Sequence, residues 1–204
     1  MSSRKNPASS WMLYCILDGE TIKQKNPVNT ARFLFKSGVG VVQLRYKNIP
    51  SYKLLRIAKK IRRLARKYGR ILLINDRADL ALVSGTDGVH AGSGDMPIKT
   101  MRRLLKPGSI IGKTVHSVKA AKRATREKID YVSAGPVFST PFKPSLRPKG
   151  VNFIKKIKKS VTVPTLAIGG INSRNAKAVL QSGADGVCVT RVIFEAKKII
   201  KEIS

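Results

Sequence analysis

The sequence predicts a single (β/α)8 barrel, in which parallel strands alternate with helices. Short runs rich in Val, Ile and Leu alternate with longer amphipathic stretches, which is typical of strands buried on both faces of a parallel sheet. Eight such runs occur in 204 residues, and no linker interrupts them, so we expect residues 1–204 to form one domain. The glycine-rich phosphate turn of an open dinucleotide-binding sheet is missing after the first run, which favours the closed barrel.

The expected strands cover residues 11–18, 39–45, 71–76, 88–92, 110–116, 131–137, 165–170 and 186–191. Residues that favour helix ends lie between them. The expected N-caps are Asn29, Ser51, Ser117 and Ser173, and Pro97 suits a first helical turn. Gly38, Gly69 and Gly183 are expected to end helices, because glycine readily adopts the left-handed conformation that follows a last turn.

Composition places the chain among soluble globular proteins. It is 42% hydrophobic and 25% charged, and no stretch approaches the ~18 apolar residues of a membrane span. Residues 1–10 are polar and are expected to form a flexible segment, not a secretory signal. Cys15 and Cys188 lie in apolar runs, where each is expected to be a buried hydrophobic residue without a disulfide. These features predict a cytoplasmic protein with no membrane partner.

The chain is strongly basic, with 41 Lys and Arg against 11 Asp and Glu, a net charge of +30. Such a charge attracts nucleic acid, anionic membranes or phosphorylated metabolites. The cations are spread over the expected helices, with no basic tail and few aromatic residues for base stacking. We therefore expect a solvated basic surface and only nonspecific electrostatic contact with nucleic acid, while a nucleic-acid-binding barrel stays open as an alternative.

Polar residues end the second expected strand. Alternation places Gln43, Arg45 and Lys47 on one side of that strand. An amide and two cations that point into a barrel need partners, and an anionic ligand supplies them. The alternative is a strand end already exposed to solvent.

Two carboxylates follow neighbouring strands. Asn75 and Asp76 end the third strand, and Asp95 follows the fourth. Magnesium is commonly held by one or two carboxylates together with phosphate oxygens and water, so Asp76 and Asp95 are candidate Mg²⁺ ligands. The alternatives are an ion pair of Asp76 with Arg77 or Arg45, and a helix-capping role for Asp95.

Both histidines, His90 and His116, fall at the ends of adjacent strands four and five. In a barrel of this class the ligand site lies at the carboxyl ends of the strands and in the loops that follow. The two histidines are therefore candidates for ligand contact or proton transfer, although a histidine at such a place is often only a hydrogen-bonded core residue.

The last three strands are followed by candidate phosphate-binding groups. The loop after strand six carries Thr140 and Lys143, strand seven ends at Gly169 and Gly170, and strand eight ends at Arg191. Phosphate sites after strands seven and eight recur in this architecture, and glycines let backbone N–H groups approach an anion. A glycine pair also suits a plain turn.

In this order, the segments QLRYK, INDRADLA, TDGVHAGSGDMP, GPVFST and AIGGI resemble the family of thiamine phosphate synthases and thiazole tautomerases. The resemblance extends from about Tyr14 to Ile193. It implies a TIM-barrel transferase that joins hydroxymethylpyrimidine diphosphate to thiazole phosphate and releases pyrophosphate with Mg²⁺ bound. The implied partners are these small phosphorylated substrates, and a homodimer is compatible with the sequence.

The resemblance also implies residue roles. It places the pyrimidine diphosphate at Gln43, Arg45, Lys47, Asn75 and His90, the metal at Asp76 and Asp95, and the thiazole phosphate and loop contacts at Thr140, Lys143, Gly169 and Gly170. Arg45, Lys47 and Lys143 are the expected catalytic cations, because they stabilise the charge of the departing pyrophosphate. In the tautomerase, a histidine at the place of His116 is catalytic.

Four positions depart from the usual family pattern. Ser93 replaces glutamine, Thr114 replaces a serine whose hydroxyl it keeps, Phe142 replaces threonine, and Arg191 replaces serine. Thr114 is expected to contact substrate, and Arg191 is expected to grip the thiazole phosphate. The alternatives to the synthase are a thiazole tautomerase acting on a carboxythiazole phosphate and a catalytically impaired barrel that binds phosphorylated ligands or polyanions.

Overall fold

A computed structural model describes residues 11–92, 94–141 and 144–204, and these form a closed eight-stranded barrel. The strands are β1 (Leu13–Asp18), β2 (Val41–Arg45), β3 (Ile71–Asn75), β4 (Gly88–Ala91), β5 (Ile110–Val115), β6 (Tyr131–Ala134), β7 (Thr165–Ile168) and β8 (Gly186–Val189). Every strand pairs in parallel with its neighbours, and β8 pairs with β1 to close the ring. The predicted (β/α)8 barrel is confirmed.

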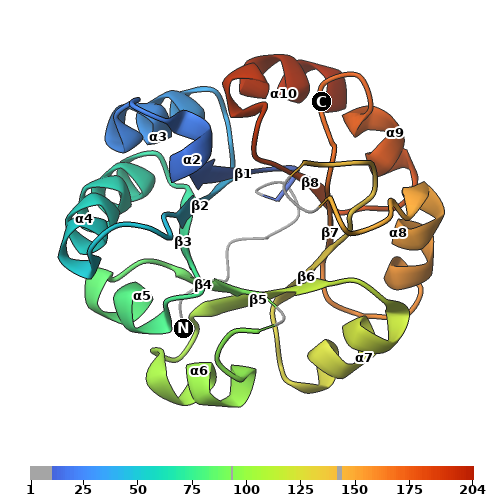
Figure 1. Cartoon of the computed structure of the whole chain (residues 1–204), viewed down its shortest axis with the longest axis horizontal. Coiled ribbons are helices and arrows are strands. Elements are labelled where there is room, and N and C mark those ends of the chain that lie inside the picture. The colour runs from blue at the N-terminus through green and yellow to red at the C-terminus, as the bar shows by residue number, and fades with distance from the viewer. Residues whose placement is uncertain (1–10, 93, 142–143) are drawn as a thin grey trace.

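Helices surround the ring of strands on its outside (Figure 1). They are α2 (Gly19–Ile22), α3 (Pro27–Lys36), α4 (Ser51–Lys67), α5 (Ala78–Ser84), α6 (Ile98–Leu104), α7 (Val118–Arg126), α8 (Gly150–Lys158), α9 (Ala176–Gln181) and α10 (Ala196–Ile203), with a short 3-10 turn at Ile193–Glu195. Among the described residues, no helix has both the length and the apolar character that crossing a membrane requires.

Strand alternation divides the core into two parts. In β1, Leu13, Cys15 and Leu17 pack outward against the helices, whereas Tyr14 and Ile16 belong to a separate cluster inside the barrel. The inner cluster also contains Trp11, Val41, Leu73, Tyr131, Leu166 and Cys188. Both cysteines are buried free thiols, as expected, one in each part of the core.

Several expected helix and strand ends are wrong. Asn26, not Asn29, caps α3, because its side chain accepts the N–H groups of Val28 and Asn29. Ser51 is the first residue of α4 and not its cap, and Ser173 lies before Asn175, the capping position of α9. Strand β7 ends at Ile168 because Gly169 and Gly170 have φ of 103° and 66°, outside the extended region.

Other expected ends are confirmed. The Ser117 hydroxyl accepts the N–H of Ala120 at the start of α7. Gly38, Gly69 and Gly183 each follow the last turn of a helix with positive φ. Residues 1–10, expected to be a flexible segment, lie outside the described residues.

An aspartate immediately precedes each of β4, β6 and β8, at the rim where the strands begin. Asp87, Asp130 and Asp185 accept the backbone N–H groups of Leu72, Ile111 and Thr165, respectively, and pair with Arg62, Arg102 and Lys158 of the outer helices. Each carboxylate thus joins two strands and one helix, and we call this arrangement the clamp. Gly40, not an aspartate, precedes β2, so the pair formed by β1 and β2 lacks the clamp.

The clamp predicts a stability effect at the strand-start rim. Asp185→Ala leaves the N–H of buried Thr165 without its acceptor, so the free energy of unfolding in urea is expected to fall by about 1–3 kcal/mol. Lys158→Met removes only a partly exposed ion pair and is expected to cost less than about 1 kcal/mol. Equal losses in the two variants would contradict the N–H assignment.

Candidate active site

One cavity of about 660 Å³ opens at the carboxyl ends of the strands and is lined by the residues that the sequence singled out. Its lining includes Gln43, Arg45, Lys47, Asn75, Asp76, His90, Asp95, Thr114, His116, Thr140, Gly169, Gly170 and Arg191. Lys143, the other predicted site residue, and the departures at Ser93 and Phe142 lie outside the described residues. Barrel closure therefore brings together groups taken from seven of the eight strands and the loops that follow them.

The two polar residues of β2 and Lys47, which lies two residues beyond its end, reach the cavity at different depths. Gln43 is buried, and its amide donates to the Tyr14 hydroxyl at 2.6 Å. Arg45 is partly buried and pairs with Asp18, and Lys47 is exposed at the mouth. Leu44 faces the helices, as alternation predicts.

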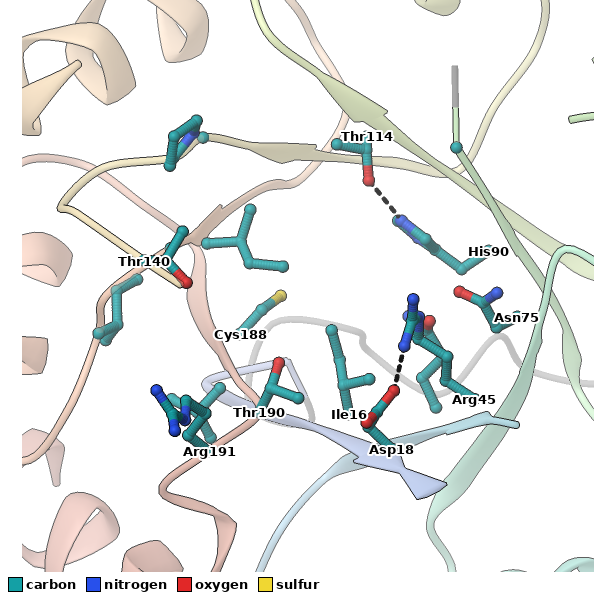
Figure 2. A pocket seen from close by; sticks show the side chains of 18 of the residues that line it. Ile16, Asp18, Arg45, Asn75, His90, Thr114, Thr140, Cys188, Thr190 and Arg191 are labelled. Atoms are coloured by element: carbon teal, nitrogen blue, oxygen red, sulfur yellow. Dashed lines mark hydrogen bonds and ion pairs between the residues drawn. The ribbon is translucent and has the colours of Figure 1, made fainter. Parts of the chain in front are cut away.

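Asp18 is a site residue that the sequence analysis missed. It ends β1, lines the cavity and is 1% exposed (Figure 2). Its carboxylate accepts from the Arg45 guanidinium and from the Thr21 N–H, which caps α2. This pair fixes the direction of Arg45. The available signal was a carboxylate at the end of an apolar strand, the same signal that singled out Asp76.

Asp76 and Asp95 face one another at the mouth of the cavity. Burial, a hydrogen bond that protonated Asp76 donates to the Asp95 carboxylate, and the negative charge of Asp95 together raise the pKa of Asp76 to about 6, while Lys47 opposes the rise. The Lys47 ammonium lies 3.6 Å from the Asp76 carboxylate. Asp76 also has a φ of 61°, a backbone conformation that few side chains adopt and that is found at functional sites.

The alternative contacts expected for these two aspartates are not formed. Arg77 pairs with Asp79 and Arg45 pairs with Asp18, so neither of them neutralises Asp76. Asp95 accepts the N–H of Gly92 within its own loop, and no side chain caps α6. Within the described residues no group of three or more His, Cys, Asp or Glu is arranged to hold a metal, so a cation here would have only two carboxylate ligands from these ranges.

The two histidines differ in their surroundings. His90 is 6% exposed and makes hydrogen bonds through both ring nitrogens, to Tyr131 through Nδ1 and to Thr114 through Nε2. Figure 2 shows the contact with Thr114. His116 Nδ1 lies 2.6 Å from the carbonyl oxygen of Gly135. A carbonyl only accepts, so His116 carries a proton on Nδ1 and links β5 to the loop after β6.

The glycine pair after β7 has a packing role that the sequence analysis did not foresee. A β-carbon on Gly169 would lie 2.6 Å from Pro136, and one on Gly170 would lie 2.5 Å from the Ser139 carbonyl oxygen. The missing side chains therefore admit the loop after β6. Figure 2 shows Arg191 and Thr140 on one side of the cavity and Arg45, Asn75 and His90 on the opposite side.

Together, the barrel and its polar mouth define a class: a (β/α)8 barrel with a ligand site formed by strand ends and the following loops. Comparison with known proteins is more specific. Residues 13–193 match the family model described as thiamine monophosphate synthase. The chain therefore belongs to the thiamine monophosphate synthase family.

Similar proteins span nearly the whole chain. A thiamine-phosphate synthase of Caldanaerobacter subterraneus subsp. tengcongensis is 40% identical over 94% of this chain and 92% of the relative. A thiamine-phosphate synthase of Pyrococcus furiosus is 38% identical over 93% and 89%. The solved thiamine phosphate pyrophosphorylase of Pyrococcus furiosus superposes with a TM-score of 0.88 at 35% identity and covers 97% of this chain and 98% of its own.

The raised pKa of Asp76 predicts a pH-dependent stability. The folded protein holds this proton more tightly than an unfolded chain with the ordinary pKa of 3.8, so the ionised carboxylate opposes folding increasingly as pH rises through about 6. In EDTA, the Tm of Asp76→Asn relative to that of the wild type is expected to increase as the pH rises from about 5 to about 7 and to stay level above about pH 7. Thermal unfolding followed by circular dichroism measures the difference.

Asp79→Asn is the matched control. Its hydrogen bond from Arg77 lowers the pKa of Asp79, so Asp79 stays ionised throughout that range and its Tm difference from the wild type stays constant. A difference for Asp76→Asn that is equally flat would show that folding does not raise the pKa of Asp76.

Proposed function

We propose that this chain is a transferase that condenses hydroxymethylpyrimidine diphosphate with hydroxyethylthiazole phosphate to give thiamine phosphate and pyrophosphate. The observation that carries the proposal is the facing pair Asp76 and Asp95, beside Lys47 and on the same rim as Arg45. The family and the thiamine-phosphate synthase relatives support it. The tautomerase alternative moves a proton on a monophosphate and needs no diphosphate site, so this pair favours the synthase.

The site suits Mg²⁺. A carboxylate whose pKa is raised by burial and by a second carboxylate beside it is a favourable place for a divalent cation, and diphosphate oxygens with water would complete the coordination of that cation. When bound, Mg²⁺ would supply charge neutralisation to the diphosphate. Asp76 and Asp95 are the residues that would hold it.

The chain's own cations then act on the leaving group. The carbon–oxygen bond of the pyrimidine diphosphate breaks, and its electron pair leaves with pyrophosphate. Arg45, oriented by Asp18, and Lys47 stabilise the growing negative charge, and Lys143 is predicted to do the same. Because the protein holds these charged side chains in place before the reaction begins, they need not move as the bond breaks.

The thiazole nitrogen then captures the pyrimidine cation with its lone pair, forming the new carbon–nitrogen bond. No proton leaves that nitrogen, so no strong base is required. Holding the two substrates in line supplies a further part of the acceleration. In this proposal His116 serves the reaction through its place on the cavity wall and its hydrogen bond to Gly135, which positions the loop after β6.

The two sides of the cavity suit the two substrates. Asn75 and His90 lie on the side with Arg45 (Figure 2), and Gln43 of β2 and Thr114 of β5 also line the cavity; the pyrimidine diphosphate is proposed to lie against these residues. Thr140 and Arg191 lie on the other side (Figure 2), and Gly169 and Gly170 follow β7 and line the cavity; the thiazole phosphate is proposed to lie there. The two substrates would approach each other between β4 and β8.

The reaction is tested by mixing the two substrates with MgCl2 and purified protein and detecting thiamine phosphate by chromatography. Asp76→Ala and Asp95→Ala are each expected to lower kcat at least about 100-fold. The matched control is Asp79→Ala, an exposed carboxylate three positions away that pairs with Arg77 outside the cavity. A wild type that forms no product, or that works equally well in EDTA, would contradict the proposal.

The departure at Arg191 predicts a substrate-specific effect. If its guanidinium binds the thiazole phosphate, Arg191→Ala is expected to raise KM for that substrate about tenfold and leave KM for the pyrimidine diphosphate unchanged. Arg174→Ala, an exposed arginine that does not line the cavity, is the control. An unchanged KM for the thiazole phosphate would remove Arg191 from the site.

A further inference from the structure

A continuous set of hydrogen bonds crosses the barrel interior from β2 to β5. The Gln43 amide donates to Tyr14 (2.6 Å), the Tyr14 and Tyr131 hydroxyls lie 3.1 Å apart, Tyr131 lies 2.7 Å from His90 Nδ1, and His90 Nε2 lies 2.8 Å from the Thr114 hydroxyl. We call these five residues the interior chain. Its two ends and His90 line the cavity, whereas the tyrosines do not.

The barrel provides space for this set. Tyr131 in β6 pairs with Gly112 in β5, which in turn pairs with His90 in β4. A β-carbon on Gly112 would lie 1.9 Å from the Tyr131 ring, so only glycine lets the ring cross β5. The hydroxyl thereby reaches a histidine two strands away.

The two tyrosines are held as neutral donors in fixed positions. Tyr14 is 1% exposed and Tyr131 is 0% exposed, and burial raises the pKa of both phenols well above the ordinary value. Trp11 packs on Tyr131 with ring centroids 4.7 Å apart. Each hydroxyl therefore keeps its single proton and has few alternative directions for it.

The Gln43 amide donates to Tyr14, whereas either partner can be the donor in the Tyr14–Tyr131 and Tyr131–His90 contacts. One proton order gives the hydroxyl protons of both tyrosines an acceptor within the interior chain: in that order the Tyr14 proton goes to Tyr131, and the Tyr131 proton goes to His90 Nδ1. His90 then accepts at Nδ1 and is the neutral tautomer with its proton on Nε2, which donates to Thr114. Thr114, having accepted, has its own hydroxyl proton available to an acceptor in the cavity.

We propose that Tyr14 and Tyr131 are positioning residues that, through His90, make Thr114 a hydrogen-bond donor to the diphosphate. The inference rests on the proposed function, because diphosphate oxygens only accept hydrogen bonds and so require donors. A chain of the opposite order would present the lone pairs of Thr114 to an anion. An anionic ligand beside Thr114 therefore requires the proton order in which the Thr114 hydroxyl donates into the cavity.

The first test is the tautomer of His90 and needs no substrate. His90 and His116 are the only histidines in the sequence, so the imidazole ¹H–¹⁵N spectrum of untagged protein contains two rings, which His116→Asn assigns. We expect opposite tautomers, with the proton on Nε2 in His90 and on Nδ1 in His116. Tyr131→Phe should shift the His90 Nδ1 resonance, because it removes the donor.

The second test measures kinetics. Tyr131→Phe is expected to raise KM for the pyrimidine diphosphate about tenfold, with little change for the thiazole phosphate. The double variant Thr114→Val/Tyr131→Phe should have the same KM for the pyrimidine diphosphate as Thr114→Val alone, because Tyr131 is proposed to act on this substrate through Thr114. Tyr14→Phe, which breaks only the Gln43 end, should give a smaller change and serves if Tyr131→Phe does not fold.

Ser133→Ala is the matched control, since it removes another buried hydroxyl of β6 that contacts Cys188 and is not part of the interior chain. Multiplicative effects of Thr114→Val and Tyr131→Phe, or a His90 ring with its proton on Nδ1, would overturn the inference. A wild type without turnover would overturn the proposed function. The ¹H–¹⁵N spectrum would still show whether His90 has the tautomer that the interior chain requires.

Discussion

Closure of the parallel barrel is the constraint on which the rest of the structure depends. Because every strand runs in the same direction, residues at positions as distant as 18 and 191 end at one rim. The opposite rim carries the aspartates that join strands to helices. Contacts that join strands to helices thus lie where the strands begin, and the polar residues of the cavity lie at the other rim.

Some site residues have local features that oppose folding. Asp76 combines a positive φ with a carboxylate that Asp95 repels, and Arg45 is partly buried and needs Asp18. Such features persist when the surrounding structure determines them fully. A cation would relieve the repulsion between the two carboxylates, so the features that oppose folding are consistent with the proposed binding of a cation and a diphosphate together.

The barrel was predictable because strand and helix periodicities are local and repeat eight times. The mouth was predictable because polar residues at the ends of apolar strands are conspicuous, and Asp76 and Asp95 do meet there. Helix caps were less predictable, since Asn26 and Asn29 are equally suitable by type and only the backbone decides between them. Each wrongly predicted helix cap lies within a few residues of the residue that occupies the capping position.

Partners across the barrel could not be predicted from local patterns. Tyr14 and Tyr131 lie in apolar runs 117 positions apart, where an aromatic residue is ordinarily core, and Gly112 has no turn to explain it. Only their pairing in space shows that the glycine makes room for a hydroxyl. Asp18 differs from these residues, because its place at the end of an apolar strand was visible in the sequence and only its ion pair with Arg45 on the next strand was not.

The two sides of the cavity differ in a way that the proposed reaction explains. The diphosphate gains charge on its leaving oxygen as the bond breaks, so cations beside a pair of carboxylates suit the side with Arg45 and Lys47. The thiazole phosphate keeps its charge throughout and needs only to be held. In the proposed function, Arg191 and the two glycines that line the cavity meet that requirement, so a cation at position 191 suits the proposed reaction although the family resemblance implies a serine there.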